Sequence, residues 1–201
     1  MSKLSVPLSI LLVLLLSAYW SQAQAEMTAE ELKQQIQGRS GKIKEFRALL
    51  NDPDQTVRLA ALDVMLKSDD IAMRELAFGM GFSSADEAMR AVALKNKFAD
   101  QKMISVKIAK ITSPSDTQKK ALKDWGSIYT FNVKDFDEKT GQFTTKGSYR
   151  GGTGQLNGTR IEFSQQYCSG SFQLGDGAVL GGELGCSGGW NGTFEGQITL
   201  Q

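Results

Sequence analysis

The apolar residues of this 201-residue chain change their spacing near residue 100, and this change limits the possible folds more than any other feature. Before that point they recur every three to four residues, which is typical of amphipathic helices. Further along they alternate with polar residues, as in Ile104, Val106 and Ile108, which is typical of half-buried strands. The sequence therefore predicts an α+β chain, with a helical module at residues 26–100 and an antiparallel β domain at residues 101–201.

Start and stop signals divide the helical module into expected helices. The expected starts are Thr28 with Glu31, the segment before Ile43, Asp52 with Pro53, Asp70, and Ser84 with Glu87. Gly38 and Gly79 are expected to end the first and the fourth helix. Val64, on the third helix, is expected to face inward because it continues an apolar stripe.

A constant sequence separation relates two of the expected helix pairs. It matches Asp54 with Asp86, Arg58 with Arg90 and Leu62 with Leu94. Such a period is typical of a helix-pair repeat, and the alternative is a small helical bundle in which the period is accidental. Residues 52–61 (DPDQTVRLAA) also resemble the turn and second helix of a HEAT repeat, and the resemblance covers residues 41–98. It implies a protein-binding scaffold without catalysis. Two units are fewer than the roughly three that such stacks usually need, so something else must cover their apolar ends.

The β domain is expected to be an antiparallel meander that forms a curved sheet or a small barrel. The expected strands are 104–108, 129–133, 142–149, 152–164, 167–174, 179–186 and 192–200, with a loop or short helix between the first two. Fifteen of the 21 glycines lie from Gly147 onward, and several fall inside these strands. Glycine inside a strand indicates curvature or the close approach of an aromatic ring.

The two cysteines support one strand register. If Cys168 faces Cys186 across a hairpin centred on Gly177, then Phe172 faces Gly182, so that a large residue meets a small one. Both cysteines follow an expected export signal and enter an oxidising compartment, where a pair more often forms a bridge than two free thiols. A disulfide between Cys168 and Cys186 is therefore predicted.

Residues 1–25 have the pattern of a cleaved signal peptide. Lys3 precedes an apolar run over residues 8–16, and the small residues of Ala23-Gln24-Ala25 follow. The alternative is a membrane anchor, but the apolar run is shorter than the roughly 20 residues that a spanning helix needs. The protein is expected to be secreted or periplasmic, with no membrane span after cleavage. Loss of Lys3 leaves equal numbers of acidic and basic side chains, which argues against a nucleic-acid partner.

The chain contains no histidine, and this excludes the usual catalytic triads and histidine-ligated metals. Residues 185–189 match the G-x-S-x-G motif but lack its base, and residues 135–141 resemble the start of a calcium loop but are better explained as a hairpin turn. The candidate carboxylates Glu162, Glu183 and Glu195 are expected to point outward, because they alternate with inward apolar residues. No catalytic, cofactor-binding or metal-binding residue is therefore predicted.

Binding is the expected function, and an unidentified exported protein is the expected partner of the helical module. The alternative is a carbohydrate or small ligand held by the β domain, on a surface formed by Trp125, Tyr149, Tyr167 and Trp190. A carboxylate-dependent hydrolase is a third possibility. Asn157 and Asn191 begin formal glycosylation sequons, which in a bacterial protein would mark only tight turns.

Overall fold

The computed structural model describes residues 27–109, 111, 114–146, 151–188 and 191–200. The helices that precede the first strand in this part of the chain are α2 (Ala29–Leu50), α3 (Gln55–Leu66), α4 (Ile71–Ser83) and α5 (Glu87–Ala99). The chain divides into one unit that ends at Lys42 and a second that spans residues 43–201, so that α2 crosses the boundary. The change from helix to strand near residue 100 falls inside the second unit.

Side chains of the expected types begin these helices, with two corrections. Thr28 and Glu31 form the expected capping box, and Asp70 is the N-cap of α4. The N-caps of α3 and α5 are Asp54 and Asp86, not Asp52 and Ser84. The side chains of Asp52 and Ser84 instead accept a hydrogen bond from the backbone N–H of the following cap residue. They shape the turn before each helix, and the cap lies two residues later than expected.

Glycine does not end the first or the fourth helix. Helix α2 continues through Gly38 to Leu50, and α4 continues through Gly79 to Ser83. One glycine costs a helix only about 1 kcal/mol relative to alanine, which neighbouring turns can offset. The expected inward position of Val64 is also wrong, because this side chain is 64% exposed while Leu62 is fully buried.

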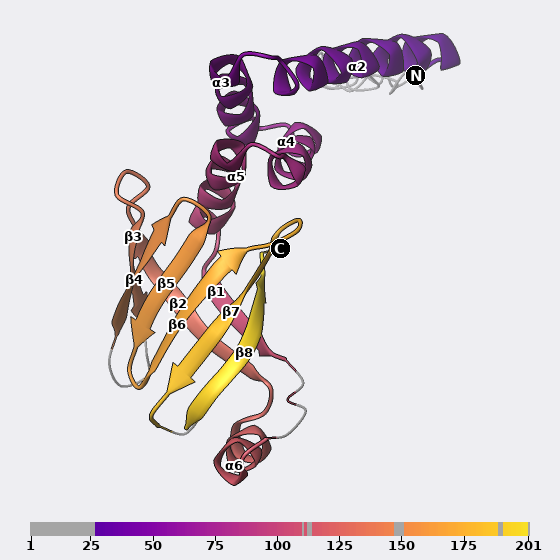
Figure 1. Ribbon diagram of the computed structural model, residues 1–201. Coiled ribbons are helices and arrows are strands. Elements are labelled where there is room, and N and C mark those ends of the chain that lie inside the picture. Colours follow the sequence, from indigo (N-terminus) through magenta and orange to yellow (C-terminus); the bar gives the residue numbers. More distant parts are fainter. Residues whose placement is uncertain (1–26, 110, 112–113, 147–150, 189–190, 201) are drawn as a thin grey trace, which may run out of the picture. The chain divides into compact units, whose positions relative to one another are not determined.

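The β domain is a closed antiparallel barrel, which confirms the expected α+β architecture (Figure 1). Its strands are β1 (Met103–Ile108), β2 (Ile128–Phe136), β3 (Gln142–Lys146), β4 (Gly152–Asn157), β5 (Arg160–Gln165), β6 (Cys168–Leu174), β7 (Val179–Cys186) and β8 (Gly192–Thr199). Each strand pairs with the next, and β1 pairs with β8 to close the barrel. The single strand expected at 152–164 is wrong: Gly158, with φ of 57°, turns the chain between β4 and β5.

The predicted register of the cysteine hairpin is confirmed. Cys168 faces Cys186 and Phe172 faces Gly182 across β6 and β7. Gly170 lies under aromatic rings, since a Cβ atom there would sit 2.7 Å from ring atoms of both Phe163 and Phe172. These two rings stack with their centroids 6.1 Å apart. The interior of the barrel is therefore filled by side chains, and the inward glycines make room for the rings.

Helix α5 and the barrel share one hydrophobic core within the unit that spans residues 43–201. The Phe98 side chain is fully buried, and its ring centroid lies 5.0 Å from that of Phe136 and 4.9 Å from that of Phe143. A further helix, α6 (Asp116–Trp125), lies between β1 and β2, where a loop or short helix was expected. It is held against β8 by Gln118, whose Nε2 atom donates to the carbonyl oxygen of Thr193 at 2.8 Å.

Candidate functional site

Large apolar side chains are exposed along the helical segment. Met27, Leu32, Ile36, Leu49, Val64 and Ile71 have exposed fractions from 41% to 75%. Leu32 and Ile36 are four residues apart on α2 and so share one face of that helix. Met27, Leu32 and Ile36 belong to the unit that ends at Lys42, and Leu49, Val64 and Ile71 belong to the unit that spans residues 43–201, so that each set is a separate group of exposed apolar side chains.

A largely buried ion pair joins α3 to α5. The guanidinium of Arg58 donates from Nη2 to Asp86 Oδ2 at 2.7 Å, and the two side chains are only 21% and 14% exposed. The Nη1 atom of the same arginine donates to the carbonyl oxygens of Asp52 and Pro53, at 2.8 and 3.0 Å. The hydrogen bond from Arg58 lowers the pKa of the Asp86 carboxyl. Arg58 thus braces the turn before α3 and fastens α3 to the start of α5.

Arg90, which lies one sequence period after Arg58, contacts the barrel. Its Nη2 atom donates to the carbonyl oxygen of Leu174 at 3.1 Å and to that of Gly175, both at the end of β6. Nearby, Thr159 Oγ1 donates to Glu87 Oε1 at 3.2 Å. These junction residues were not among the sites expected from the sequence, although the period relates them to the α3 residues that contact α5.

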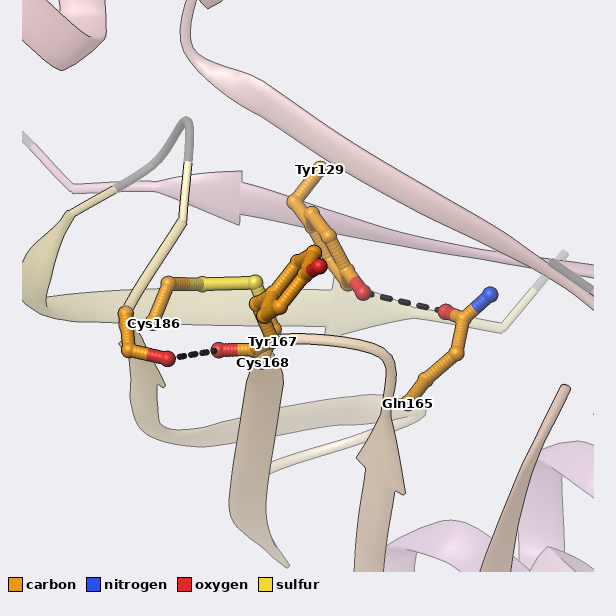
Figure 2. Close-up of a disulfide and its surroundings, with 6 residues drawn as sticks. Tyr129, Gln165, Tyr167, Cys168 and Cys186 are labelled. Carbon is orange, nitrogen blue, oxygen red and sulfur yellow. Dashed lines mark hydrogen bonds between the residues drawn. A yellow bond between two sulfur atoms is a disulfide. The ribbon is translucent and has the colours of Figure 1, made fainter. Parts of the chain in front are cut away.

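The disulfide closes the β6–β7 hairpin next to a polar group inside the barrel (Figure 2). Cys168 is bonded to Cys186, as predicted, and a disulfide is compatible with an extracellular or periplasmic location. The hydroxyl of Tyr129 donates to Gln165 Oε1 at 3.0 Å, and burial raises the pKa of Tyr129 to about 12. Gln165 is only 5% exposed, so this hydrogen bond satisfies a buried amide oxygen.

Two of the four aromatic residues expected to form a ligand surface lie in the described part of the chain. Trp125, the last residue of α6, is 60% exposed, and Tyr167, which precedes Cys168, is 62% exposed. Figure 2 shows Tyr167 beside the disulfide. Tyr149 and Trp190 lie outside the described residues. The four residues therefore remain a predicted surface.

The candidate carboxylates point outward, as expected. Glu162, Glu183 and Glu195 are all exposed. Glu183 and Glu195 face each other across β7 and β8, whereas Ser171 on β6 separates Glu162 from Glu183. Like charges directly opposite each other on a sheet destabilise it slightly, and nothing in this arrangement distinguishes an acid from a base. The arrangement therefore carries no assignment of catalytic roles.

The segment that resembled a calcium loop is the hairpin turn between β2 and β3, as expected. Asp137 Oδ1 accepts hydrogen bonds from the backbone N–H groups of Lys139 and Thr140, and the first of these is the main reason why the pKa of Asp137 is lowered. Asn157 and Asn191, the first residues of the two sequons, are both exposed. Asn157 ends β4, and Asn191 directly precedes β8.

A hollow of about 730 Å³ lies over β3, β4 and β5 of the barrel, and Phe143 and Phe163 line it together with polar side chains. Its lining includes the outward side chains of Gln142, Thr144, Thr153, Gln155, Glu162 and Ser164. Thr144 donates to Asp135 Oδ2 at 3.0 Å, which fixes one edge of the hollow. Hydroxyl, amide and carboxylate groups in a hollow of this size can form directed hydrogen bonds with a polyhydroxylated ligand.

No protein-family model, curated protein or solved structure matches this chain. Within the ranges that the structure describes, no helix is both long enough and apolar enough to cross a membrane.

Proposed function

We propose that this protein is an exported, non-catalytic binding protein that recognises another exported protein through its helical segment. The observation that carries the proposal is the exposure of Val64 on α3 and Ile71 on α4, within the unit that spans residues 43–201; Leu32 and Ile36 on α2 form a separate apolar face in the unit that ends at Lys42. Burying one such side chain at an interface contributes about 1.5–3 kcal/mol. A few of them would supply the apolar centre of a specific interface.

The barrel supports this function as a rigid end to the helical stack. A HEAT-like stack needs its apolar ends covered, and Phe98, Arg90 and Glu87 attach α5 to the barrel. The absence of histidine and the exposure of Glu162 and Glu183 favour binding over catalysis.

Site-specific photocrosslinking of the full mature chain in its exporting cell tests the proposal. A photoreactive residue replaces Leu32 or Val64, and the matched control replaces Ile128, which is 56% exposed on β2. Point replacements suit this protein better than deleting the helices, because Phe98 belongs to the core shared with the barrel. The proposal predicts one discrete adduct at Leu32 or Val64 and none at Ile128. Adducts at Ile128 alone would contradict it.

The hollow over β3, β4 and β5, which is lined by both polar and aromatic side chains, supports a second candidate function, the binding of a carbohydrate. A glycan array probed with the mature protein tests this candidate. Thr153→Val should abolish binding if the hollow holds the sugar, whereas Tyr167→Ala or Trp125→Ala should abolish it if the aromatic surface does. An array with no binding to the unmodified protein would exclude this candidate.

A further inference from the structure

Two helices, α3 and α5, use equivalent sequence positions to contact the next part of the protein. On α3 these positions are Gln55, Arg58 and Leu62, which are called the front face here. Gln55 Nε2 donates to both carboxylate oxygens of Asp86 at 3.2 Å, and Arg58 donates to Oδ2 at 2.7 Å. Leu62 is fully buried where α4 and α5 approach closely: a Cβ atom at Gly81 would lie 3.4 Å from Leu62 Cδ1. The front face of α3 therefore contacts Asp86, the N-cap of α5, through Gln55 and Arg58, and its Leu62 is buried beside Gly81 of α4.

The same three positions on α5, displaced by one repeat period, pack near or against the barrel. Glu87 accepts from Thr159, Arg90 donates to the carbonyl of Leu174, and Leu94 is fully buried. The barrel therefore takes the place that a following helix pair would occupy, and the stack cannot extend in that direction.

A second face of each helix lies about 100° around the axis from the front face and is called the back face here; it is covered on α5 and more exposed on α3. On α5 the back face consists of Asp86, held by Arg58, and of Met89 and Ala93, which are 2% and 0% exposed. The equivalent residues on α3 are Asp54, Val57 and Ala61, and Val64 lies one turn further on. Asp54 is exposed, Val57 and Ala61 are half-buried, and Val64 is 64% exposed.

Asp54 is presented in the same way as Asp86. The backbone angles φ and ψ are −78° and 119° at Asp54, and −82° and 112° at Asp86. Each carboxylate caps its helix: Asp54 Oδ1 accepts from the N–H of Thr56 at 2.7 Å, and Asp86 Oδ1 accepts from that of Ala88 at 2.9 Å. Asp86 also receives an arginine, whereas Asp54 has no ion pair with any described residue. The back face of α3 thus repeats the acceptor surface with no ion pair at Asp54 among the described residues and with Val64 exposed, while Ala61 packs against the core of the protein.

We propose that the back face of α3, formed by Asp54, Val57, Ala61 and Val64, is the docking surface for a helix of a partner protein that presents an arginine and, four residues later, a leucine. The proposal rests on the proposed function, and it names the partner chemistry. It follows from charge complementarity and from the occupant of the equivalent surface on α5, where Arg58 and Leu62 have this spacing. A second copy of this chain cannot supply this pair of an arginine and a leucine, because Leu62 and Leu94 are fully buried within the chain itself.

A peptide that copies the front face of α3 tests the docking surface. The probe is residues 54–67 of this chain, with a fluorophore and with a hydrocarbon staple joining positions 60 and 64, which lie outside the front face. Its binding to the full mature protein is measured by fluorescence anisotropy. Saturable binding is expected, and Asp54→Asn in the protein should weaken it at least about tenfold, because a charge-assisted hydrogen bond is lost. Asparagine keeps the helix cap, so folding is preserved.

Three further variants make the result specific. Val64→Glu should abolish binding, and Asp69→Asn, at an exposed aspartate in the loop before α4, should leave it unchanged. Replacing Arg58 of the probe by glutamine should weaken binding as much as Asp54→Asn does, and the two changes together should weaken it no further. Thermal unfolding of each variant, followed by circular dichroism, verifies that the protein remains folded.

Failure to bind a probe that is helical in solution would overturn the docking surface, as would binding that ignores both Asp54→Asn and Val64→Glu. Sedimentation showing that the mature protein dimerises through Val64 would assign the surface to a second copy and overturn the choice of partner. Photocrosslinks at Leu32 but not at Val64 would also overturn this docking surface while leaving the proposed function intact.

Discussion

Phe98→Ala should destabilise the helices and the barrel together. The Phe98 ring is fully buried and packs 4.9 Å from the ring of Phe143 and 5.0 Å from that of Phe136, measured between centroids. Truncating a buried phenylalanine leaves a cavity and costs about 3–5 kcal/mol. The loss falls on both sides of the junction, because α5 supplies Phe98 and strands β2 and β3 supply its partners.

Native-state hydrogen exchange, read by mass spectrometry of fragments, separates the two parts. A loss of about 4 kcal/mol corresponds to roughly thousandfold faster exchange of the amides that open only by global unfolding. This acceleration is expected in fragments from α5 and equally in fragments from β6. Ile71→Ala is the matched control, because Ile71 is 75% exposed and its truncation should change stability by less than about 0.5 kcal/mol. Faster exchange in α5 with unchanged exchange in β6 would refute a shared core.

Three further substitutions test individual contacts. Gly170→Ala should lower the free energy of unfolding by about 1–3 kcal/mol in urea, because its Cβ would lie 2.7 Å from the Phe163 ring. Gly181→Ala is the control and should be close to neutral, because a Cβ there would meet no atom within 4 Å. Equal effects would contradict the close packing of rings over Gly170. Glu183→Lys should raise stability by about 0.5 kcal/mol in the same assay by replacing the repulsion with Glu195 by an attraction, and a loss would contradict that pairing. Asp86→Asn should flatten the acid limb of the pH–stability curve. Because Arg58 lowers the pKa of Asp86 in the folded state, the stabilisation is present above the unfolded-state pKa and is lost as the pH falls through the folded-state pKa. An unchanged acid limb would argue against the ion pair.

Local patterns predict much of the barrel. Placing Cys168 opposite Cys186 across a turn at Gly177 predicts the observed register, and the resulting pairing of Phe172 with Gly182 supports it. The turn at Gly158 is marked by a change of phase, because the inward positions are even before it, as at Leu156, and odd after it, as at Ile161 and Phe163; the expected single strand over 152–164 overlooks this change. The closure of β1 on β8 depends on residues far apart in the chain, and no local pattern records it.

In the helical segment, sequence patterns predict the helices but not which of their faces are buried. Periodicity identifies the helices, but it does not distinguish an apolar residue that faces the stack from one that faces solvent, and Val64 was placed on the wrong side. Leu62, Met65 and Leu66 face inward because α4 and α5 lie on that side of α3. The role of Phe98 was equally hidden, since an apolar residue near the end of a helix does not reveal that its partners come from a barrel.

The most direct test of binding through the helical segment is the dissociation constant of the crosslinked partner, measured with purified proteins by isothermal titration calorimetry. Leu32→Glu or Val64→Glu in the mature chain should weaken binding at least about tenfold, because each places a charge where an apolar side chain would be buried. Ile128→Glu, an equally exposed position on the barrel, should leave the dissociation constant within about twofold of the unmodified protein. Weakening by Ile128→Glu alone would contradict the account and assign binding to the barrel.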